Sequence, residues 1–182
     1  MSVQSVTAVW ERLAESYRAF SSASKDFFSE GIDQLTCLRR AFRNEDRPIA
    51  IYMIQFLSNS EIKELFGELV YLASFSHGSI QAVRRLILSL PRDWVLANIE
   101  KFADPILAAG DYDEYRRFLE LYMELDHDLA FKLATRATQQ EDEDIKEAGE
   151  DFLEKLMPEV ENATPIRIIG APGIPLSESN PV

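Results

Sequence analysis

The sequence predicts an all-α protein made of antiparallel helical hairpins, and three observations support this prediction. Apolar residues recur at spacings of three and four through most of the chain, as they do on one face of an α-helix. Only three of the eight prolines come before Pro158, so helix-breaking residues are rare in that part of the chain. The third observation is an internal repeat.

A five-residue segment occurs three times, at 83–87 (VRRLI), 115–119 (YRRFL) and 149–153 (GEDFL). The first step is 32 residues, from Arg84 to Arg116, and the second is 34 residues, from Phe118 to Phe152. Self-similarity at this period is typical of stacked helical hairpins, which usually act by presenting a binding surface.

The first part of the chain follows this period poorly. We expect helices there at 5–22, 26–43 and 47–58. Pro48 suits the first turn of the third helix, where the missing N–H costs little. The segment 48–57 is rich in Ile, Tyr and Phe, which also favour strands, but the helical body offers no clear strand partner. We therefore expect a helix that is buried on nearly all sides.

Six further helices follow at helical spacing. They are expected at 60–75, 79–90, 92–108, 111–125, 127–139 and 142–157. Ser60 and Ser79 are suitable N-caps for the first two, and Pro91 suits the first turn of the third. Gly110 suits a helix end, and Asp111 begins a capping-box pattern for the next helix.

Taken in order, these six helices pair into about three hairpins. Short loops favour antiparallel packing of consecutive helices. We expect residues 1–157 to form a single all-α domain, in which 1–58 is an irregular cap over the apolar end of the stack and 60–157 holds the hairpins. Residues 158–182 contain five prolines and are expected to form an extended tail, since prolines interrupt helices.

The net charge of −12 is concentrated in the second half of the chain. Residues 1–91 hold ten basic and ten acidic residues, whereas residues 92–182 hold nine basic and 21 acidic residues. An acidic field repels phosphate groups, which argues against nucleic-acid binding by that half. Either the charge only solvates the surface, or it forms an acidic face for a basic partner.

Cys37 is the only cysteine, so the chain cannot form an intramolecular disulfide or a thiolate metal cluster. Its apolar neighbours favour a buried core position. The N-terminus lacks a basic signal-peptide region, and no apolar run is long enough for a membrane span. We therefore expect a cytoplasmic protein without membrane contact.

The segment 142–156 resembles the second helix of a HEAT repeat. It begins with an acidic turn and continues with Ile145, Lys146, the small residues Ala148 and Gly149, and a late leucine. The segments 79–86 and 111–118 are similar in parts, and the resemblance covers about residues 60–157. Similarity to HEAT repeats implies a short α-solenoid that binds partners along a curved face.

Two pairs of arginines are the first candidate partner-binding residues: Arg84 with Arg85, and Arg116 with Arg117. Equivalent positions of stacked hairpins lie close together, so these side chains should be neighbours. One interpretation is that one arginine of each pair forms a structural ladder with acidic turn residues such as Asp111 and Asp113. The other is a basic ridge for an acidic or phosphorylated ligand.

The other candidates are aromatic residues and apolar residues of the tail. Tyr112 and Tyr122 are of a type that is common at interfaces, although core packing also explains them. Ile166, Ile168 and Ile169 could pair as a strand with another chain, which would be a route to homo-oligomers. Packing of the tail on the body, or a disordered extension, are the alternatives.

No catalytic, cofactor-binding or metal-binding motif is recognisable. A single Glu-x-x-His, Glu124 to His127, falls short of the two that a di-iron bundle needs. A glycine-rich phosphate loop and a Gly-x-Ser-x-Gly elbow are both absent from the sequence. We therefore expect no enzymatic activity and no cofactor.

The sequence thus predicts a non-catalytic protein–protein interaction module, a scaffold or adaptor, that binds another protein through the solenoid face, the tail or both. The alternative is an acidic inhibitor or immunity-type protein that neutralises a basic, nucleic-acid-binding protein. An enzyme with an unrecognised site is a third hypothesis.

Overall fold

The computed structural model describes residues 3–29 and 31–156, and within these ranges the chain is all-α. It contains ten helices, which are α1 (Val3–Phe27), α2 (Gln34–Ala41), α3 (Arg47–Ile54), α4 (Asn59–Glu64), α5 (Phe66–Ala73), α6 (Ile80–Ser89), α7 (Arg92–Ala109), α8 (Tyr112–Leu125), α9 (His127–Ala137) and α10 (Glu143–Leu156). No strand occurs in the part of the chain that is described. The predicted tail, 158–182, lies outside it.

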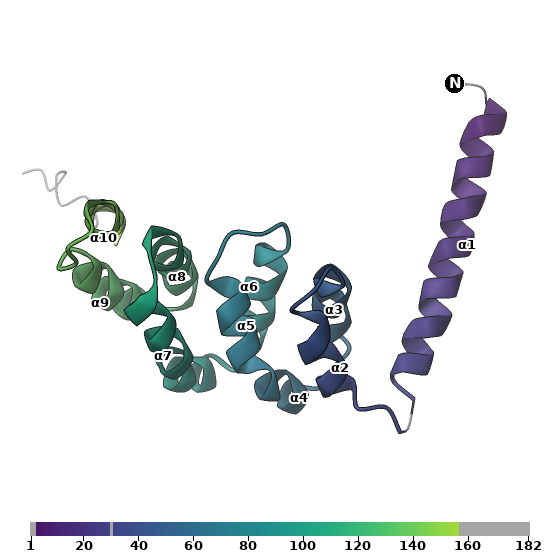
Figure 1. The fold of residues 1–182 in the computed structure, drawn as a ribbon, viewed down its shortest axis with the longest axis horizontal. Coiled ribbons are helices and arrows are strands. Elements are labelled where there is room, and N and C mark those ends of the chain that lie inside the picture. Colours follow the sequence, from purple (N-terminus) through teal and green to yellow (C-terminus); the bar gives the residue numbers. More distant parts are fainter. Residues whose placement is uncertain (1–2, 30, 157–182) are drawn as a thin grey trace, which may run out of the picture.

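Helices α2 to α10 follow one another in a row, while α1 projects from one end of that row (Figure 1). Within the row, α5 packs on both α6 and α7, α8 packs on α7 and α9, and α9 packs on α10. Helix α3 packs on α6 and so connects α2 and α3 to the later helices of the row. One continuous apolar core runs through the row, from Leu38 in α2 to Phe152 in α10.

Two of the predicted helices, 26–43 and 60–75, are each interrupted. Helix α1 continues to Phe27 and the chain then turns through Gly31, whose φ of +89° suits glycine because it has no Cβ. Asp33 caps the new helix α2 by accepting from the Thr36 N–H. The second interruption falls at Leu65, a fully buried residue between α4 and α5.

The N-cap of α4 lies two residues earlier than predicted, at Ser58 rather than Ser60, and the helix starts at Asn59. Ser58 and Glu61 form a reciprocal capping box, in which the Ser58 N–H donates to the Glu61 carboxylate at 2.7 Å. Hydrogen bonds from the Ser58 side chain and backbone lower the pKa of Glu61. The capping box predicted at Asp111 and Glu114 is confirmed at the start of α8.

The ambiguous segment 48–57 is helical as far as Ile54 and then turns, and it is not buried on nearly all sides. Ala50, Ile51, Met53 and Ile54 of α3 face the core. Ile49, Tyr52 and Phe56 are instead about half exposed, on the side toward α1. The core expectation for Cys37 is also wrong: Leu38 takes the buried position and the neighbouring Cys37 faces outward.

Helix α1 reaches the row through its last turns. The Phe20 ring lies 5.6 Å from the Tyr52 ring, and the Ser24 hydroxyl lies 3.8 Å from the Met53 sulfur. Its first turns extend away from the row, so α2 and α3, rather than α1, cover the end of the core (Figure 1).

Helices α9 and α10 approach each other most closely at Gly149. A Cβ at this position would lie 2.7 Å from the Ala134 carbonyl oxygen and 2.9 Å from both the Ala137 Cβ and the Thr138 nitrogen. Two of these three atoms belong to the backbone of α9, which cannot move without disturbing the helix. Only glycine therefore allows this packing.

We predict that Gly149→Ala destabilises the protein by about 1–3 kcal/mol, because the added methyl group would force α9 and α10 apart. Urea unfolding followed by circular dichroism measures the change. Gly78→Ala is the matched control, since a Cβ there meets nothing within 4 Å, and its effect should stay within about 0.5 kcal/mol. Equal stability of the two variants would contradict the close packing of α9 on α10.

Candidate protein-binding surface

Arg84 is a buried structural residue rather than part of an exposed ridge. Its side chain on α6 is only 3% exposed, and its Nη2 lies 2.6 Å from the Glu120 carboxylate on α8. The same Nη2 donates to the Arg117 carbonyl oxygen at 3.1 Å. Its Nε is buried and has no hydrogen-bond partner in the described residues. Glu120 is therefore the group that balances the buried charge.

The other two arginines of this cluster also turn toward carboxylates. Arg117 donates to Glu120 at 2.8 Å and lies 3.2 Å from Asp113. Arg116 lies 3.8 Å from Glu120 and donates to the Tyr112 hydroxyl at 2.8 Å. This matches the structural interpretation of the arginine pairs, with Glu120 as a central member that the sequence did not indicate.

Asp113 extends the same cluster to the loop after α5. Its carboxylate accepts from the Ser76 N–H at 2.9 Å and from the Ser76 hydroxyl at 3.0 Å. Asp111 takes no part in it, because its side chain caps α8; its bonds with Glu114 and with the Asp113 N–H lower the pKa of Asp111. The cluster thus joins α8 both to α6 and to the loop that precedes α6.

The remaining predicted candidates are separated in the structure. Tyr122 is 2% exposed, and burial, together with the nearby Glu100 and Asp104 carboxylates, raises the pKa of its phenol. Arg85 is exposed and lines a groove of about 610 Å³ between α3 and α6, with mainly apolar neighbours. Ile166, Ile168 and Ile169 lie outside the described residues.

The two histidines have different environments, since the ring of His77 is hydrogen-bonded to the backbone and that of His127 is exposed. His77 uses both ring nitrogens, since Nδ1 accepts from the Ser79 N–H at 3.2 Å and Nε2 lies 2.8 Å from the Leu72 carbonyl oxygen. His127 is exposed beside Asp126, whose carboxylate caps α9 and pairs with Arg92. Within residues 3–29 and 31–156, no group of three or more His, Cys, Asp or Glu side chains is arranged to bind a metal ion.

A second groove of about 610 Å³ is lined by three arginines that the sequence interpretation overlooked. Arg39, Arg43 and Arg47 come from α2, from the turn after it and from the start of α3. The opposite lining comes from α5 and α7 and consists of Gly67, Glu68, Tyr71, Leu72 and Phe102. We call this the arginine groove.

Each arginine of the groove has a different environment. Arg39 pairs with Glu68 at 2.9 Å and also donates to the Glu64 carbonyl oxygen. Arg47 donates to the Phe42 carbonyl oxygen and lies over the Phe75 ring, 5.5 Å from its centre. The Arg43 side chain is exposed and forms no ion pair or hydrogen bond among the described residues.

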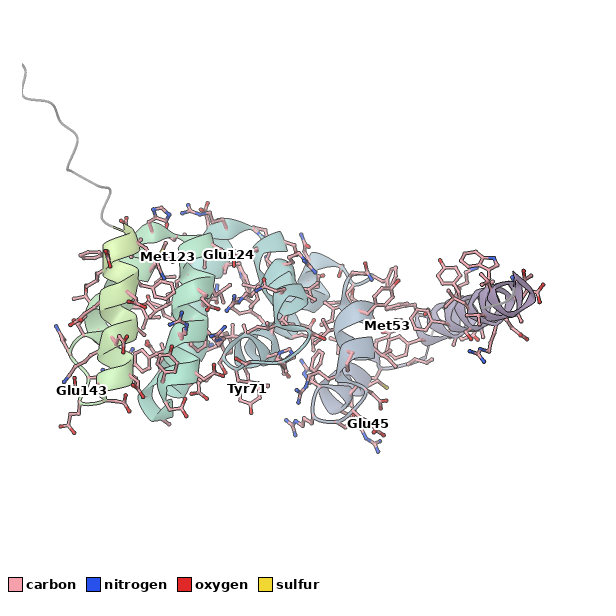
Figure 2. The ribbon with its side chains drawn as sticks, turned by 90° about the horizontal axis from the view of Figure 1, so that it is seen from above. Glu45, Met53, Tyr71, Met123, Glu124 and Glu143 are labelled. Atoms are coloured by element: carbon pink, nitrogen blue, oxygen red, sulfur yellow. The ribbon has the colours of Figure 1, made fainter. Side chains whose placement is uncertain are left out.

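Tyr71 adds an aromatic side to the groove. It is 58% exposed and points outward from α5, on the side of the molecule where Glu45 also lies (Figure 2). Phe42 and Leu72 are buried beneath it. The arginine groove therefore combines exposed cationic groups with an aromatic wall and an apolar floor.

The three arginines of the groove recur every four residues in the sequence. Because helix α2 ends at Ala41 and α3 begins only at Arg47, this spacing does not place them on one helix face. The arginine pairs of the repeat are adjacent in sequence, and this is a more obvious pattern than the spacing of Arg39, Arg43 and Arg47. The residues of α5 and α7 that complete the groove carry no local pattern of this kind.

Compared with known proteins, the chain matches no family model, no curated protein and no solved structure. In the described part of the chain, no helix is long and apolar enough to cross a lipid bilayer.

We predict that Glu120→Gln destabilises the protein by about 2–3 kcal/mol, because it leaves the buried Arg84 charge unbalanced. The value lies below that for a fully buried pair, since Glu120 remains 26% exposed. Chemical unfolding with two independent probes measures the loss.

The matched control is Glu100→Gln, which removes the partner of Lys132, a side chain that is 70% exposed. Exposed pairs contribute about 0–1 kcal/mol, so this variant should remain close to the wild type. A loss at Glu120 no larger than that at Glu100 would show that Arg84 does not depend on its carboxylate.

Proposed function

We propose that about residues 60–157 form a short HEAT-like α-solenoid, that the protein acts as a non-catalytic protein-binding module, and that the arginine groove takes an acidic segment of a partner protein. The observation that carries this proposal is the groove itself, in which three arginines and the exposed Tyr71 surround an apolar floor.

The solenoid part of the proposal is supported by where the repeated segment lies. Its three copies fall on α6, α8 and α10, which are the second helices of successive pairs. The equivalent residues Val83, Tyr115 and Gly149 are all buried. Such correspondence is expected when each hairpin packs on the previous one in the same way.

Ion pairs between equivalent helices give further support. Lys132 of α9 pairs with Glu100 of α7, and Arg136 of α9 pairs with Asp104 of α7, each across 32 residues of sequence. The Arg84–Glu120 pair connects α6 with α8 in a similar manner, across 36 residues. First helices are thus linked to first helices and second helices to second helices.

The acidic character of the partner segment follows from the charges that line the groove. Three arginines and one glutamate give a net lining charge of +2, and Arg39 already neutralises Glu68. Guanidinium groups bind carboxylates with paired, directional hydrogen bonds. The exposed Tyr71 and the apolar floor suit an aliphatic or aromatic side chain next to the acidic one.

The alternative of an acidic inhibitor has weaker support. Several carboxylates of the second half are engaged in ion pairs within the chain, among them Glu100, Asp104, Glu120 and Asp126. These groups contribute less to an attractive field for a basic partner than the formal charge of the chain indicates.

We predict that a short dye-labelled peptide of alternating glutamate and leucine binds the full-length chain, and that Arg43→Gln weakens this binding by about fivefold. The factor corresponds to the loss of about 1 kcal/mol from one partly exposed ion pair. Fluorescence anisotropy at low and high salt measures the dissociation constants, and salt should weaken the wild type more than the variant.

Arg85→Gln is the matched control, because Arg85 is also exposed but lines the groove between α3 and α6. Its dissociation constant should equal that of the wild type. An equal loss at Arg85 and Arg43 would contradict binding in the arginine groove. Tighter binding of a lysine–leucine peptide than of the glutamate–leucine peptide would favour the acidic-inhibitor alternative.

A further inference from the structure

Helix α1 has an apolar side that the rest of the described chain covers only at its end, where Phe20 meets Tyr52 of α3. Its large apolar residues are between 36% and 67% exposed, and they are Val6, Val9, Trp10, Leu13, Tyr17 and Phe20. No residue from Val6 to Phe20 is buried. Figure 2 shows α1 standing apart from the row, with side chains directed into solvent. An apolar side of this length is typical of an interaction surface.

The spacing of these residues is that of a helix that packs against another helix. Val6, Trp10, Leu13, Tyr17 and Phe20 alternate at four and three residues, which is the heptad pattern of paired helices. We call these five residues the α1 seam. The residues beside the seam are small or uncharged, namely Thr7, Val9, Ala14, Ser16, Ser21 and Ala23.

Helix α1 has six charged residues, Glu11, Arg12, Glu15, Arg18, Lys25 and Asp26, three basic and three acidic, so the helix has no net charge. Five of them lie away from the seam and from these flanking positions, whereas Lys25 lines a groove together with Tyr17 and Phe20. A helix that binds an anionic lipid surface needs an excess of basic residues beside its apolar side. A charged protein partner would find only this one lysine beside the seam.

We propose that the α1 seam pairs with the α1 seam of a second copy of this chain, in an antiparallel arrangement that forms a homodimer. Two identical apolar faces related by a twofold axis cover each other completely, without a charged partner. The charge distribution also favours this occupant. Pairing through α1 joins the half of the chain with no net charge and leaves the acidic halves, net −12 each, at the far ends.

The area available is sufficient for a stable dimer. Because the large seam residues are one-third to two-thirds exposed, covering them buries on the order of 600 Å² per chain, since a fully buried aromatic side chain alone accounts for roughly 150–250 Å². The total of about 1,200 Å² reaches the lower end of specific protein interfaces, about 1,200–2,000 Å². Grooves beside α1 add to this area.

Two apolar grooves flank the last turns of α1, where it meets α3. One, of about 460 Å³, is lined by Tyr17, Phe20, Tyr52 and Phe56 among others. The other, of about 320 Å³, is adjacent to it, shares Phe20 and Ser24 with it and includes Ile49. In the antiparallel arrangement, the first turns of α1 in the second copy, which extend away from their own row, pack against these grooves. A parallel one would bring both rows of helices to the same end of the pair and leave the first turns of both copies of α1 away from these grooves.

The antiparallel pairing has a definite register. If the twofold axis passes near Leu13 and Ala14, Trp10 of each copy lies opposite Tyr17 of the other. The two copies of Leu13 are then adjacent, whereas the two copies of Val6 are about 22 Å apart, at a rise of 1.5 Å per residue. The grooves beside α1 share no lining residue with the arginine groove, so the inference does not depend on the proposed function.

Sedimentation equilibrium of the full-length chain tests the dimer, since a monomer has a mass of 20.8 kDa. We predict a dimer for the wild type and at least a 100-fold higher dissociation constant for the double variant Leu13→Glu, Tyr17→Glu, because unpaired carboxylates are costly to bury (about 2 kcal/mol or more each). Ala8→Glu, Ala19→Glu adds the same charges to the opposite side of α1 and should remain dimeric.

A monomeric wild type at all concentrations would overturn the proposal, and so would a dimer that survives the double seam variant. Circular dichroism shows whether each variant remains folded. Single cysteines in a Cys37→Ser background test the direction, because Cys37 is the only cysteine. Oxidation should crosslink Leu13→Cys but not Val6→Cys, whereas crosslinking of both would overturn the antiparallel arrangement.

Discussion

The guanidinium of Arg84 lies between α6 and α8, almost entirely out of contact with solvent, and its charge has to be balanced there. Glu120 supplies that balance, and the same carboxylate also holds Arg116 and Arg117 on its own helix. A charge buried without a partner is far more costly than a lost surface contact. The relative position of α6 and α8 is therefore restricted to arrangements in which Arg84 reaches Glu120.

Because of this pairing, most arginines of the repeat are not available to a partner. Arg84, Arg116 and Arg117 of the repeat are directed inward or toward carboxylates and stabilise the row. Arg85 is instead exposed and lines the groove between α3 and α6. The arginines of α2 and α3 come before the repeat begins and line a groove that opens to solvent. Under the proposed function, binding and stability depend on different arginines. Arg43 can be changed with little expected effect on folding, because its side chain has no ion-pair or hydrogen-bond partner among the described residues.

Local features of the sequence predict most of the helices but not their environment. Asp111 with Glu114, Gly110 and Pro91 mark boundaries that the structure reproduces closely, because capping depends on neighbouring residues. The division of 60–75 at Leu65 has no proline to indicate it, and the nearest glycine, Gly67, lies inside α5. The burial of Arg84 depends on a carboxylate 36 residues away, and the exposure of α1 depends on where the chain turns near Gly31. Neither the burial of Arg84 nor the exposure of α1 can be deduced from the spacing of residues in the sequence alone.

The most direct test of this account is a double-mutant cycle between Arg84 and Glu120. Free energies of unfolding are measured for Arg84→Met, for Glu120→Gln and for the double variant. We predict that the double variant is more stable than the sum of the single losses implies, by about 2 kcal/mol or more, because both charges are then removed together. Losses that add within about 0.5 kcal/mol would contradict the claim that this pair fixes the position of α6 relative to α8.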